Sequence, residues 1–271
     1  MAVRMTVLAS GSKGNSTVLS SSDTSILVDA GLSCKETLKR MTAAGEDPLK
    51  LNGIVITHEH QDHVNGLAVL ARKLRIPVFM TGATHQAWKR WSRKHQYADA
   101  PERAKVEQLE LFESGREFHI GNIGVTPFTI PHDAVDPVGF VFNVEGVKIG
   151  FATDLGYMPP NVKAALKRID VLLLESNHDL EMLKDGPYPW SVKQRVLSRV
   201  GHLSNLATAE FLERDYDGSA SYIVLGHLSE SNNAPELARL AAEQAVSCHP
   251  TLLGNRILLA EQSAPLEPIC L

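Results

Sequence analysis

The sequence predicts a layered α/β domain with two sheets, and three observations support this prediction. The chain has 271 residues, of which 44% are hydrophobic and 21% charged, so it is long enough for one large α/β domain or two small ones. Strands come first, then helices, then a second series of strands that leads into alternating helices and strands. Neither a low-complexity linker nor a short repeat interrupts the chain. We therefore expect a single domain over residues 1–271.

In the first half of the chain, short apolar runs predict strands, and helical spacing of apolar residues predicts helices. The expected strands are residues 5–10, 16–21, 24–31, 51–57 and 76–80. The expected helices are residues 34–44, 64–74 and 82–98. Between the first two strands, the cluster GSKGN at residues 11–15 predicts a turn, because Gly, Ser and Asn favour turn conformations.

The second half predicts a strand-rich stretch followed by helices that alternate with strands. The expected strands are residues 106–112, 116–121, 123–132, 139–145, 147–154, 170–176, 221–227 and 256–261, the last of which closes the fold. The expected helices are residues 160–167, 190–200 and 205–213, and a further helix is expected to begin with Asn233 as its cap. NVEGVKI, residues 143–149, predicts a hairpin turn.

Composition excludes several classes of protein. No run approaches the roughly 20 apolar residues of a membrane helix, and the first residues are too short an apolar stretch for a signal peptide. Three widely spaced cysteines, Cys34, Cys248 and Cys270, predict neither a disulfide framework nor a cysteine zinc knuckle. We expect small buried side chains, with Cys270 exposed, in a cytoplasmic protein that has no membrane partner. The net charge of −4 argues against a basic coat for nucleic acid but leaves a local basic groove open.

A cluster of metal-binding residue types directly follows the apolar strand GIVIT. Four such side chains fall within six residues: His58, His60, Asp62 and His63. These side chains are costly to bury without a partner, and a loop that leaves a strand aims alternate residues at one point. A solvated polar loop would account for one or two of them, but not for four at a strand end. We therefore favour a metal site.

Other ligands must come from distant parts of the chain, since one cluster supplies too few for two ions. Three further strands each end in an ionisable residue followed by a loop: His132, Asp154 and His227. A single histidine after a strand is usually a surface or capping residue. Three repeats of this context beside the first cluster make chance a poor explanation.

The chain resembles proteins of the metallo-β-lactamase fold through five separated motifs in the expected order. THEHQDH, residues 57–63, matches the HxHxDH signature, with Glu59 and Gln61 at its variable positions. The other motifs match at Asp29, His132, Asp154 and His227. The resemblance spans residues 6–229 and implies a four-layer αββα sandwich with two mixed sheets flanked by helices.

A finer resemblance is to the YycJ/WalJ group of bacterial nucleases with this fold. It rests on LASGSKGNSTVL at residues 8–19, LLLESNHD at 172–179, GHLSN at 201–205 and LGHLSESNN at 225–233. Proteins of this group are regarded as DNA exonucleases that act from the 5′ end. The resemblance therefore implies a DNA substrate.

The resemblance also implies a ligand set for two divalent ions. His58, His60 and His132 would hold the first ion, Asp62, His63 and His227 the second, and Asp154 would bridge both. A set of His and Asp ligands without Cys suits Zn²⁺, Mn²⁺ or Fe. Asp29 is expected to orient the loop of residues 58–63, as carboxylates behind metal ligands commonly do.

The expected reaction is metal-assisted hydrolysis of a phosphodiester. Two ions about 4 Å apart share a hydroxide that attacks phosphorus in line with the leaving oxygen. Asp62 would orient this nucleophile or take its proton, while His202 and His178 would hold a phosphate or protonate the leaving group. Further substrate-contact candidates are Ser204, Asn205, Ser229 and Asn232. Loop hydrogen bonds and helix caps account for these polar residues equally well.

Two parts of the sequence leave both a functional and a plain structural interpretation open. The amides of residues 10–15 suit a phosphate, and they suit a simple turn as well. The basic and aromatic segment 88–105 contains the best DNA-contact candidates, Arg90, Arg93 and Lys94. Its residues Trp88 and Trp91 are more simply explained as facing the core. Other histidines, His85, His95, His119 and His249, are expected to be surface or packing residues.

Two other functions compete with a DNA exonuclease. The fold supports many chemistries, so a hydrolase of RNA, of a cyclic phosphodiester or of a thioester is the main alternative. A metal-dependent scaffold without catalysis is the second, and the loss of ligands would favour it. The sequence does not indicate an oligomeric state.

Overall fold

A computed structural model describes residues 3–247 and 254–271, so Cys248 and His249 lie outside the described residues. The chain divides into two compact units. Unit 1 comprises residues 1–127, 134–138 and 262–271, and unit 2 comprises residues 128–133 and 139–261. Each unit is described below by itself.

Unit 1 is built on a seven-stranded mixed sheet with the order β14-β1-β2-β3-β4-β5-β6. The strands are β1 (Arg4–Ala9), β2 (Ser16–Ser20), β3 (Ser25–Val28), β4 (Leu51–Val55), β5 (Val78–Thr81), β6 (Leu109–Phe112) and β14 (Ile269–Cys270). Pairing is antiparallel from β14 to β3 and parallel from β3 to β6. The carboxyl ends of β3, β4 and β5 therefore meet at one edge of this sheet.

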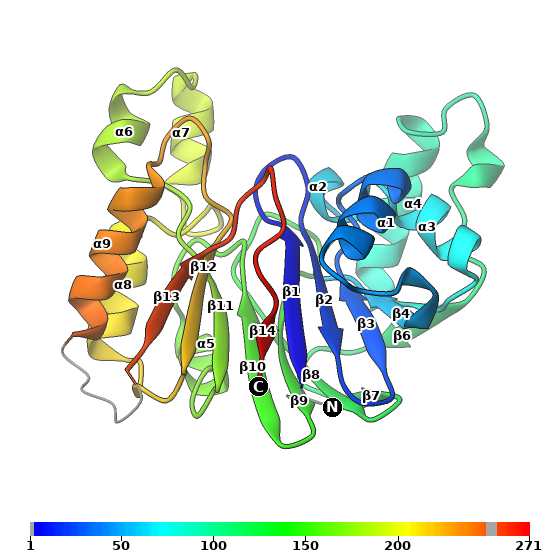
Figure 1. Cartoon of the computed structure of the whole chain (residues 1–271). Coiled ribbons are helices and arrows are strands. Elements are labelled where there is room, and N and C mark those ends of the chain that lie inside the picture. The colour runs from blue at the N-terminus through cyan, green and yellow to red at the C-terminus, as the bar shows by residue number, and fades with distance from the viewer. Residues whose placement is uncertain (1–2, 248–253) are drawn as a thin grey trace. The chain divides into compact units, whose positions relative to one another are not determined.

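Helices cover one face of the unit 1 sheet (Figure 1). They are α1 (Cys34–Ala43), α2 (Gln61–Val64), α3 (Leu67–Leu74) and α4 (Gly82–Lys94), with short 3-10 turns η1 (Pro48–Lys50) and η2 (Pro101–Arg103). Met41, Leu67 and Trp88 from three of these helices pack with sheet residues such as Ile54 in one apolar core. This core fixes the helices that precede and follow the polar loop of residues 57–63.

The second mixed sheet has the order β13-β12-β11-β10-β9-β8-β7. Its strands are β7 (Phe118–Ile120), β8 (Ile123–Thr129), β9 (Val138–Val144), β10 (Val147–Ala152), β11 (Val171–Glu175), β12 (Tyr222–Gly226) and β13 (Arg256–Leu259). Strand β7 belongs to unit 1, and both β8 and β9 begin in unit 1 and end in unit 2. Strands β10 to β13 are parallel, so their carboxyl ends also share one edge.

Unit 2 has five helices within residues 139–247 and 254–261. They are α5 (Pro160–Ala165), α6 (Leu180–Asp185), α7 (Trp190–Val196), α8 (Asn205–Arg214) and α9 (Pro235–Val246). Helices α8 and α9 lie side by side over the sheet (Figure 1), where Phe211 and Ala242 join strand residues such as Leu225 in a second apolar core. Two mixed sheets flanked by helices were expected, and this expectation is confirmed.

Several boundaries differ from the expected ones because tertiary contacts end the elements. Helix α4 ends at Lys94 rather than at residue 98, and beyond it the side chain of Gln96 donates to the carbonyl of Asn65 at 2.7 Å. Helix α7 ends at Val196 rather than at residue 200. The expected helix 64–74 begins only at Leu67 as α3, after the separate short helix α2, and the N–H of Gly66 between them donates to the carbonyl of Ala30.

Three further expectations about the second half were incomplete or wrong. Strand β13 does not close the fold, because β14 follows and pairs with β1. The cap of α9 is Ala234 rather than Asn233, whose side chain instead donates to the carbonyls of Ser176 and Asn177. Helix α6 was not expected from the sequence.

Other local expectations are confirmed. Glu145 and Gly146 both have positive φ values, of 53° and 88°, as a tight hairpin between β9 and β10 requires. Cys34 is buried and Cys270 is exposed. None of the described helices is long and apolar enough to cross a membrane.

Candidate metal centre

The parallel strands of unit 1 bring Asp29 to the histidine-rich loop. Asp29 directly follows β3, and residues 57–63 follow the neighbouring strand β4. Its carboxylate accepts the N–H of Thr57 at 2.9 Å through Oδ1, while Oδ2 lies 2.8 Å from Nδ1 of His63. A histidine whose Nδ1–H donates to a carboxylate carries its lone pair on Nε2, the atom that then binds a metal. The structure thus places Asp29 where it orients His63.

The turn at residues 10–15 reaches the same loop through Asn15. The backbone N–H of Asn15 donates to the carbonyl of Asp62 at 2.7 Å, and its side-chain Nδ2 lies 3.3 Å from Asp62 Oδ2 and 3.0 Å from His63 Nε2. The N–H groups of Gly11 and Gly14 are also bonded within the chain. This favours the turn interpretation of the segment over a phosphate cradle, and it makes Asn15 a neighbour of the candidate ligands that the sequence did not reveal.

The remaining histidines of the loop gather around His63. The ring centroids of His58 lie 4.7 Å from His60 and 4.1 Å from His63. His58 and His63 are fully buried, whereas His60 and Asp62 are half-buried. Three imidazoles and a carboxylate in so small a space are residue types that commonly hold a metal ion.

In unit 2, the parallel strands β10, β11 and β12 bring a second group together at their carboxyl ends. Asp154 follows β10, Glu175 ends β11, and His227 follows β12. His202 joins them from the loop before α8. One possible ligand atom of each of these four residues lies within 4.8 Å of those of the others. These two carboxylates and two imidazoles, buried except for the half-buried His202, are donor types that a divalent ion binds. Of the four residues, the family resemblance implies only Asp154 and His227 as ligands.

Glu175 is the central residue of this group, and the sequence reasoning missed it. Its Oε1 lies 2.7 Å from Nδ1 of His202 and 2.9 Å from Nδ1 of His227, and its Oε2 accepts the N–H groups of Leu155 and Leu203. Burial by itself would raise the pKa of Glu175, but the two histidines outweigh it and lower the pKa to about 2. Glu175 ends the apolar strand DVLLLES just as Asp154 follows KIGFAT, so the same sequence signal was present.

His132 joins the unit 2 group from the segment after β8. Its Nδ1 lies 3.2 Å from the carbonyl of Gly201, and its Nε2 lies 4.0 Å from Oδ1 of Asp154. The contact with Gly201 leaves the lone pair on Nε2, the nitrogen that faces the carboxylate of Asp154.

Three candidate residues share an uncommon backbone conformation. Asp29, Asp154 and His227 have φ values of 60°, 61° and 55°, in the left-handed region that non-glycine residues seldom adopt. Each stands at the point where a parallel strand ends, and this conformation turns the chain sharply there. Such local strain is typical of functional sites, since it persists only where the surroundings impose it.

The other predicted substrate residues of unit 2 form internal hydrogen bonds. Ser204 caps α8 by accepting the N–H of Ala207, and the side chain of Asn205 pairs with that of Asn233. Ser229 accepts bonds from the backbone and side chain of Asn232. These four candidates are buried, and their bonds are those that caps and loop contacts would make. The sequence had left this interpretation open.

His178 is buried, and neither of its ring nitrogens has a hydrogen-bond partner. Burial lowers the pKa of His178 to about 4, so the ring is neutral at pH 7. Its backbone pairs with Ser204, which precedes α8. A neutral, enclosed imidazole suits a supporting position better than direct contact with a substrate.

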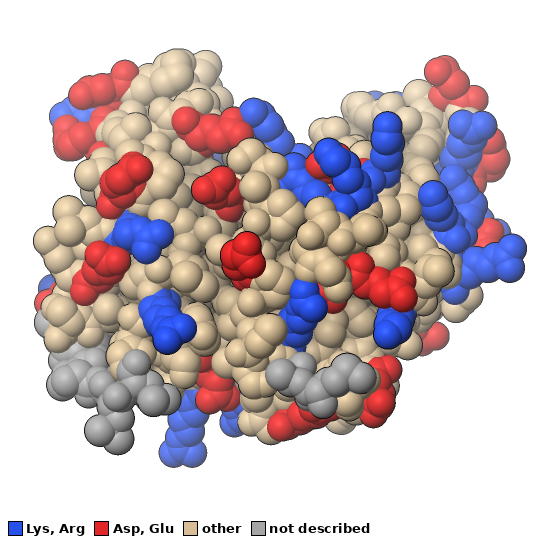
Figure 2. Space-filling model, viewed as in Figure 1, with Lys and Arg blue, Asp and Glu red and all other residues tan. Residues whose placement is uncertain are grey.

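The basic residues predicted to contact DNA are exposed on α4. Arg90, Arg93 and Lys94 lie on the outer side of the helix, whereas Trp88 is fully buried as expected and Trp91 is only half-buried. Lys and Arg side chains gather over the part of unit 1 that carries α1, α3 and α4 (Figure 2). A basic surface of this kind attracts a polyanion although the whole chain is mildly acidic.

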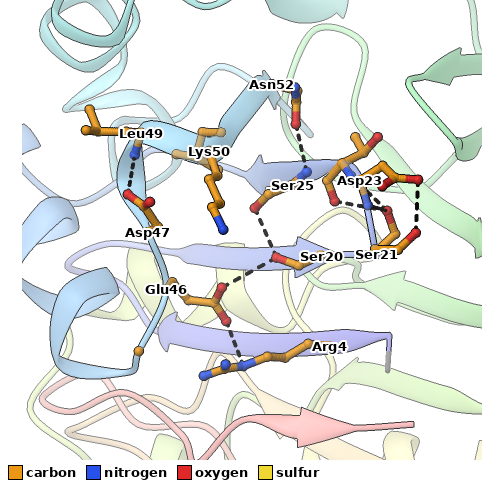
Figure 3. Close-up of a pocket in the computed structure, with 14 residues that line it drawn as sticks. Arg4, Ser20, Ser21, Asp23, Ser25, Glu46, Asp47, Leu49, Lys50 and Asn52 are labelled. Carbon is orange, nitrogen blue, oxygen red and sulfur yellow. Dashed lines mark hydrogen bonds and ion pairs between the residues drawn. The ribbon is translucent and has the colours of Figure 1, made fainter. Parts of the chain in front are cut away.

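Unit 1 has a hollow of about 670 Å³, and none of the predicted site residues lines it. Its polar groups pair with one another: Glu46 contacts Arg4 at 3.0 Å and accepts a hydrogen bond from Ser20, whose hydroxyl also contacts Ser25 (Figure 3). Arg4 and Glu46 neutralise each other, and the other charged residues of the lining, Lys50, Asp23 and Asp47, leave the hollow no net positive charge for a phosphate.

Comparison with known proteins identifies the family. The model of the "Beta-lactamase superfamily domain" matches residues 24–249. The chain is 38% identical over 246 residues to "Exodeoxyribonuclease YycJ" of Bacillus anthracis, covering 91% of this chain and 90% of that protein. It is also 38% identical over 237 residues to "Exodeoxyribonuclease WalJ" of Streptococcus pneumoniae, covering 88% and 86%.

A solved structure shows the same fold at low sequence identity. The crystal structure of Zn²⁺-bound PqqB from Methylobacterium extorquens superposes with a TM-score of 0.70 and 16% identity, covering 97% of this chain and 99% of that one. The chain therefore belongs to the beta-lactamase superfamily.

Proposed function

We propose that this protein is a dinuclear metal-dependent phosphodiesterase that removes nucleotides from the 5′ end of DNA in the cytoplasm. The observation that carries the proposal is the pair of His and carboxylate groups at the strand ends, in a chain that is 38% identical to two proteins named exodeoxyribonucleases. The family resemblance supplies the ligand set: His58, His60, Asp62, His63, His132, Asp154 and His227.

The donor chemistry of these residues fits Zn²⁺ or Mn²⁺, and also Fe. Imidazole and carboxylate ligands without thiolate are compatible with each of these metals. The contacts of His63 with Asp29 and of His132 with Gly201 direct Nε2 of each ring to the ligating role. When bound, two divalent ions supply an activated water and stabilise charge on the phosphoryl oxygens.

The chain's own groups orient the reactants and move the protons. Asp62 is held by Asn15 through both its backbone carbonyl and its carboxylate, so this carboxylate is fixed where it orients the attacking water and accepts its proton. His202 is half-buried and its Nδ1 lies 2.7 Å from Oε1 of Glu175, and in this proposal its Nε2 donates the proton to the leaving oxygen. In this proposal His178 is a positioning residue behind that loop.

The surface of α4 favours a polynucleotide substrate, and the relatives named exodeoxyribonucleases favour DNA. Arg90, Arg93 and Lys94 are exposed in the last turns of the helix, where they neutralise phosphates along a strand. The product of hydrolysis would then be a mononucleotide or a short oligonucleotide, which leaves as the strand advances over this basic surface.

The test uses protein loaded with Mn²⁺ or Zn²⁺ and substrates labelled at one end, as single- and double-stranded DNA and RNA of equal sequence. We expect a 5′ label to appear at once in the shortest products from DNA, while a 3′ label passes through a ladder of lengths. Products of intermediate length from both labels would indicate an endonuclease, and faster digestion of RNA would replace DNA as the substrate.

Matched variants assign the activity to the proposed residues. Asp154→Asn should lose bound metal and DNA hydrolysis together, whereas His202→Ala should keep the metal and lose roughly 10²- to 10⁴-fold in turnover. The exposed His119 of β7 serves as the control, and His119→Gln should retain both properties. Full hydrolysis and full metal content in Asp154→Asn would refute the assignment.

A further inference from the structure

A hollow of about 390 Å³ in unit 1 lies between the histidine-rich loop and helix α4. It is lined by Glu59, His60, Gln61, Ala87, Arg90 and Trp91. Two of these residues already have a role in the proposed function: His60 is a proposed metal ligand and Arg90 a proposed phosphate contact. Trp91 and Glu59 have no role in the proposed function, and they add an aromatic ring and a carboxyl group to the lining of this hollow.

The helical repeat explains why α4 presents one mixed face to this hollow. Ala87, Arg90, Trp91 and Lys94 are spaced by three or four residues, so they lie along one side of the helix, next to the fully buried stripe that contains Trp88. Ala87 is small and leaves the space open. The half-buried Trp91 therefore provides an aromatic wall, and Arg90 an exposed cation at its border.

Glu59 lines the hollow on the side of the histidine-rich loop and contributes a carboxyl group there. Its Oε1 accepts the N–H of Val135 at 2.9 Å, which holds the carboxyl group in place. Its Oε2 is shielded from solvent and has no hydrogen-bond partner. A carboxylate repels a phosphate, and because Oε2 is shielded, Glu59 acts on a ligand in the hollow through its charge and not through a hydrogen bond.

We propose that this hollow is a base-binding subsite, in which a base next to the cleaved phosphate stacks on Trp91 while Arg90 contacts the adjoining phosphate. The proposal rests on the proposed nuclease function and specifies how the strand is held beside the metal ligand His60. Stacking on an aromatic ring tolerates every base, as a nuclease without sequence preference requires. The Glu59 carboxylate keeps the phosphate at the Arg90 side.

The test first removes a base from the DNA substrate and then removes the indole ring of Trp91 from the protein. Oligonucleotides carry one abasic residue, which is moved one position at a time from the digested end. For the wild-type protein, binding and cleavage should weaken roughly 5- to 150-fold when the abasic residue occupies one particular position, the range expected for the loss of one stacked base.

The variant Trp91→Leu should bind intact DNA less tightly by a similar factor and should no longer distinguish the abasic substrate from the intact one. Trp91→Phe keeps an aromatic face and should preserve the distinction. A second route leaves the tryptophan in place: Ala87→Leu fills the hollow with a residue that suits a helix and should abolish the distinction as well. Trp190→Leu is the matched control, because this tryptophan is 66% exposed in unit 2 and should have no effect.

Binding is measured by fluorescence anisotropy with EDTA present, so that it does not depend on hydrolysis. Base-dependent binding that Trp91→Leu and Ala87→Leu abolish would support the subsite even if no DNA were cleaved, and that result would refute only the nuclease function. Cleavage of DNA with no sensitivity to any abasic position would overturn the subsite while leaving the nuclease intact. A sensitivity that persists in both variants would also overturn it.

Discussion

The substitution Asp29→Asn tests how the buried carboxylate of unit 1 controls the histidine-rich loop. Asp29 has a φ of 60° and is only 4% exposed. Asparagine has the same shape and tolerates the left-handed conformation, so the backbone should not change. The amide oxygen can still accept the N–H of Thr57. Its NH₂ group, however, faces Nδ1 of His63, where two donors now meet.

The magnitude follows from the bonds that are lost. Asp29→Asn removes one hydrogen bond from His63 to a charged acceptor, which we expect to lower the free energy of unfolding by about 1.5–3 kcal/mol. Asp29→Ala also removes both bonds from Thr57 and adds about 1–2 kcal/mol for a left-handed alanine, giving a total loss of about 5 kcal/mol or more. The flipped tautomer of His63 should weaken metal binding by roughly 10- to 100-fold in Asp29→Asn.

Urea unfolding of the metal-free proteins measures the stability differences, and competition with a chromophoric chelator measures metal affinity. We expect the order wild type, Asn variant, Ala variant in stability. Equal losses in the two variants would show that neither the bonds from Thr57 nor the left-handed backbone at Asp29 contributes to the difference in stability. Unchanged metal affinity in Asp29→Asn would refute the role of Asp29 in orienting His63.

Two further predictions concern unit 2. Glu175→Gln should lower the free energy of unfolding by about 2–4 kcal/mol, because an amide has one acceptor oxygen and its NH₂ group must face either the two histidines at Oε1 or the two backbone N–H groups at Oε2. The exposed control Glu181→Gln should stay within about 0.5 kcal/mol of wild type in the same urea titration, and an equal effect would contradict this reasoning. The pKa of His178 is about 4 in the folded protein and about 6.5 in the unfolded chain. Below pH 6.5 the unfolded chain therefore binds a proton that the folded protein does not bind. The free energy of unfolding falls as the pH decreases through this range. Between pH 7 and pH 4 the wild type should therefore lose roughly 3 kcal/mol relative to His178→Gln, and a constant difference across this range would argue against a buried neutral ring.

Local sequence patterns were sufficient to predict the elements whose structure depends on residues adjacent in the chain. The strand before His58 and the strands that lead to Asp154 and His227 were correctly predicted, because a short apolar run needs little context to form a buried strand. The hairpin at Glu145 and Gly146 was equally local, since its turn depends on two adjacent residues.

Long-range contacts decided the rest. The sequence could not indicate that β14 pairs with β1, nor that Asn15 would contact Asp62, because each pair is joined only through the finished sheet and its loops. The burial of Trp88 and the partial exposure of Trp91 depend on how α4 docks, which its periodicity alone left open.

By itself, then, the sequence determined the fold class, the family and the residue types of the candidate site, because motif spacing and apolar periodicity are properties of the chain alone. Only the tertiary structure decided which atoms of those residues face each other. Glu175 illustrates the difference: its position at a strand end was visible in the sequence, but its four hydrogen bonds were not. Parallel strands bring their carboxyl ends to one edge only after the sheet has formed, and that edge assembles each cluster of ligands.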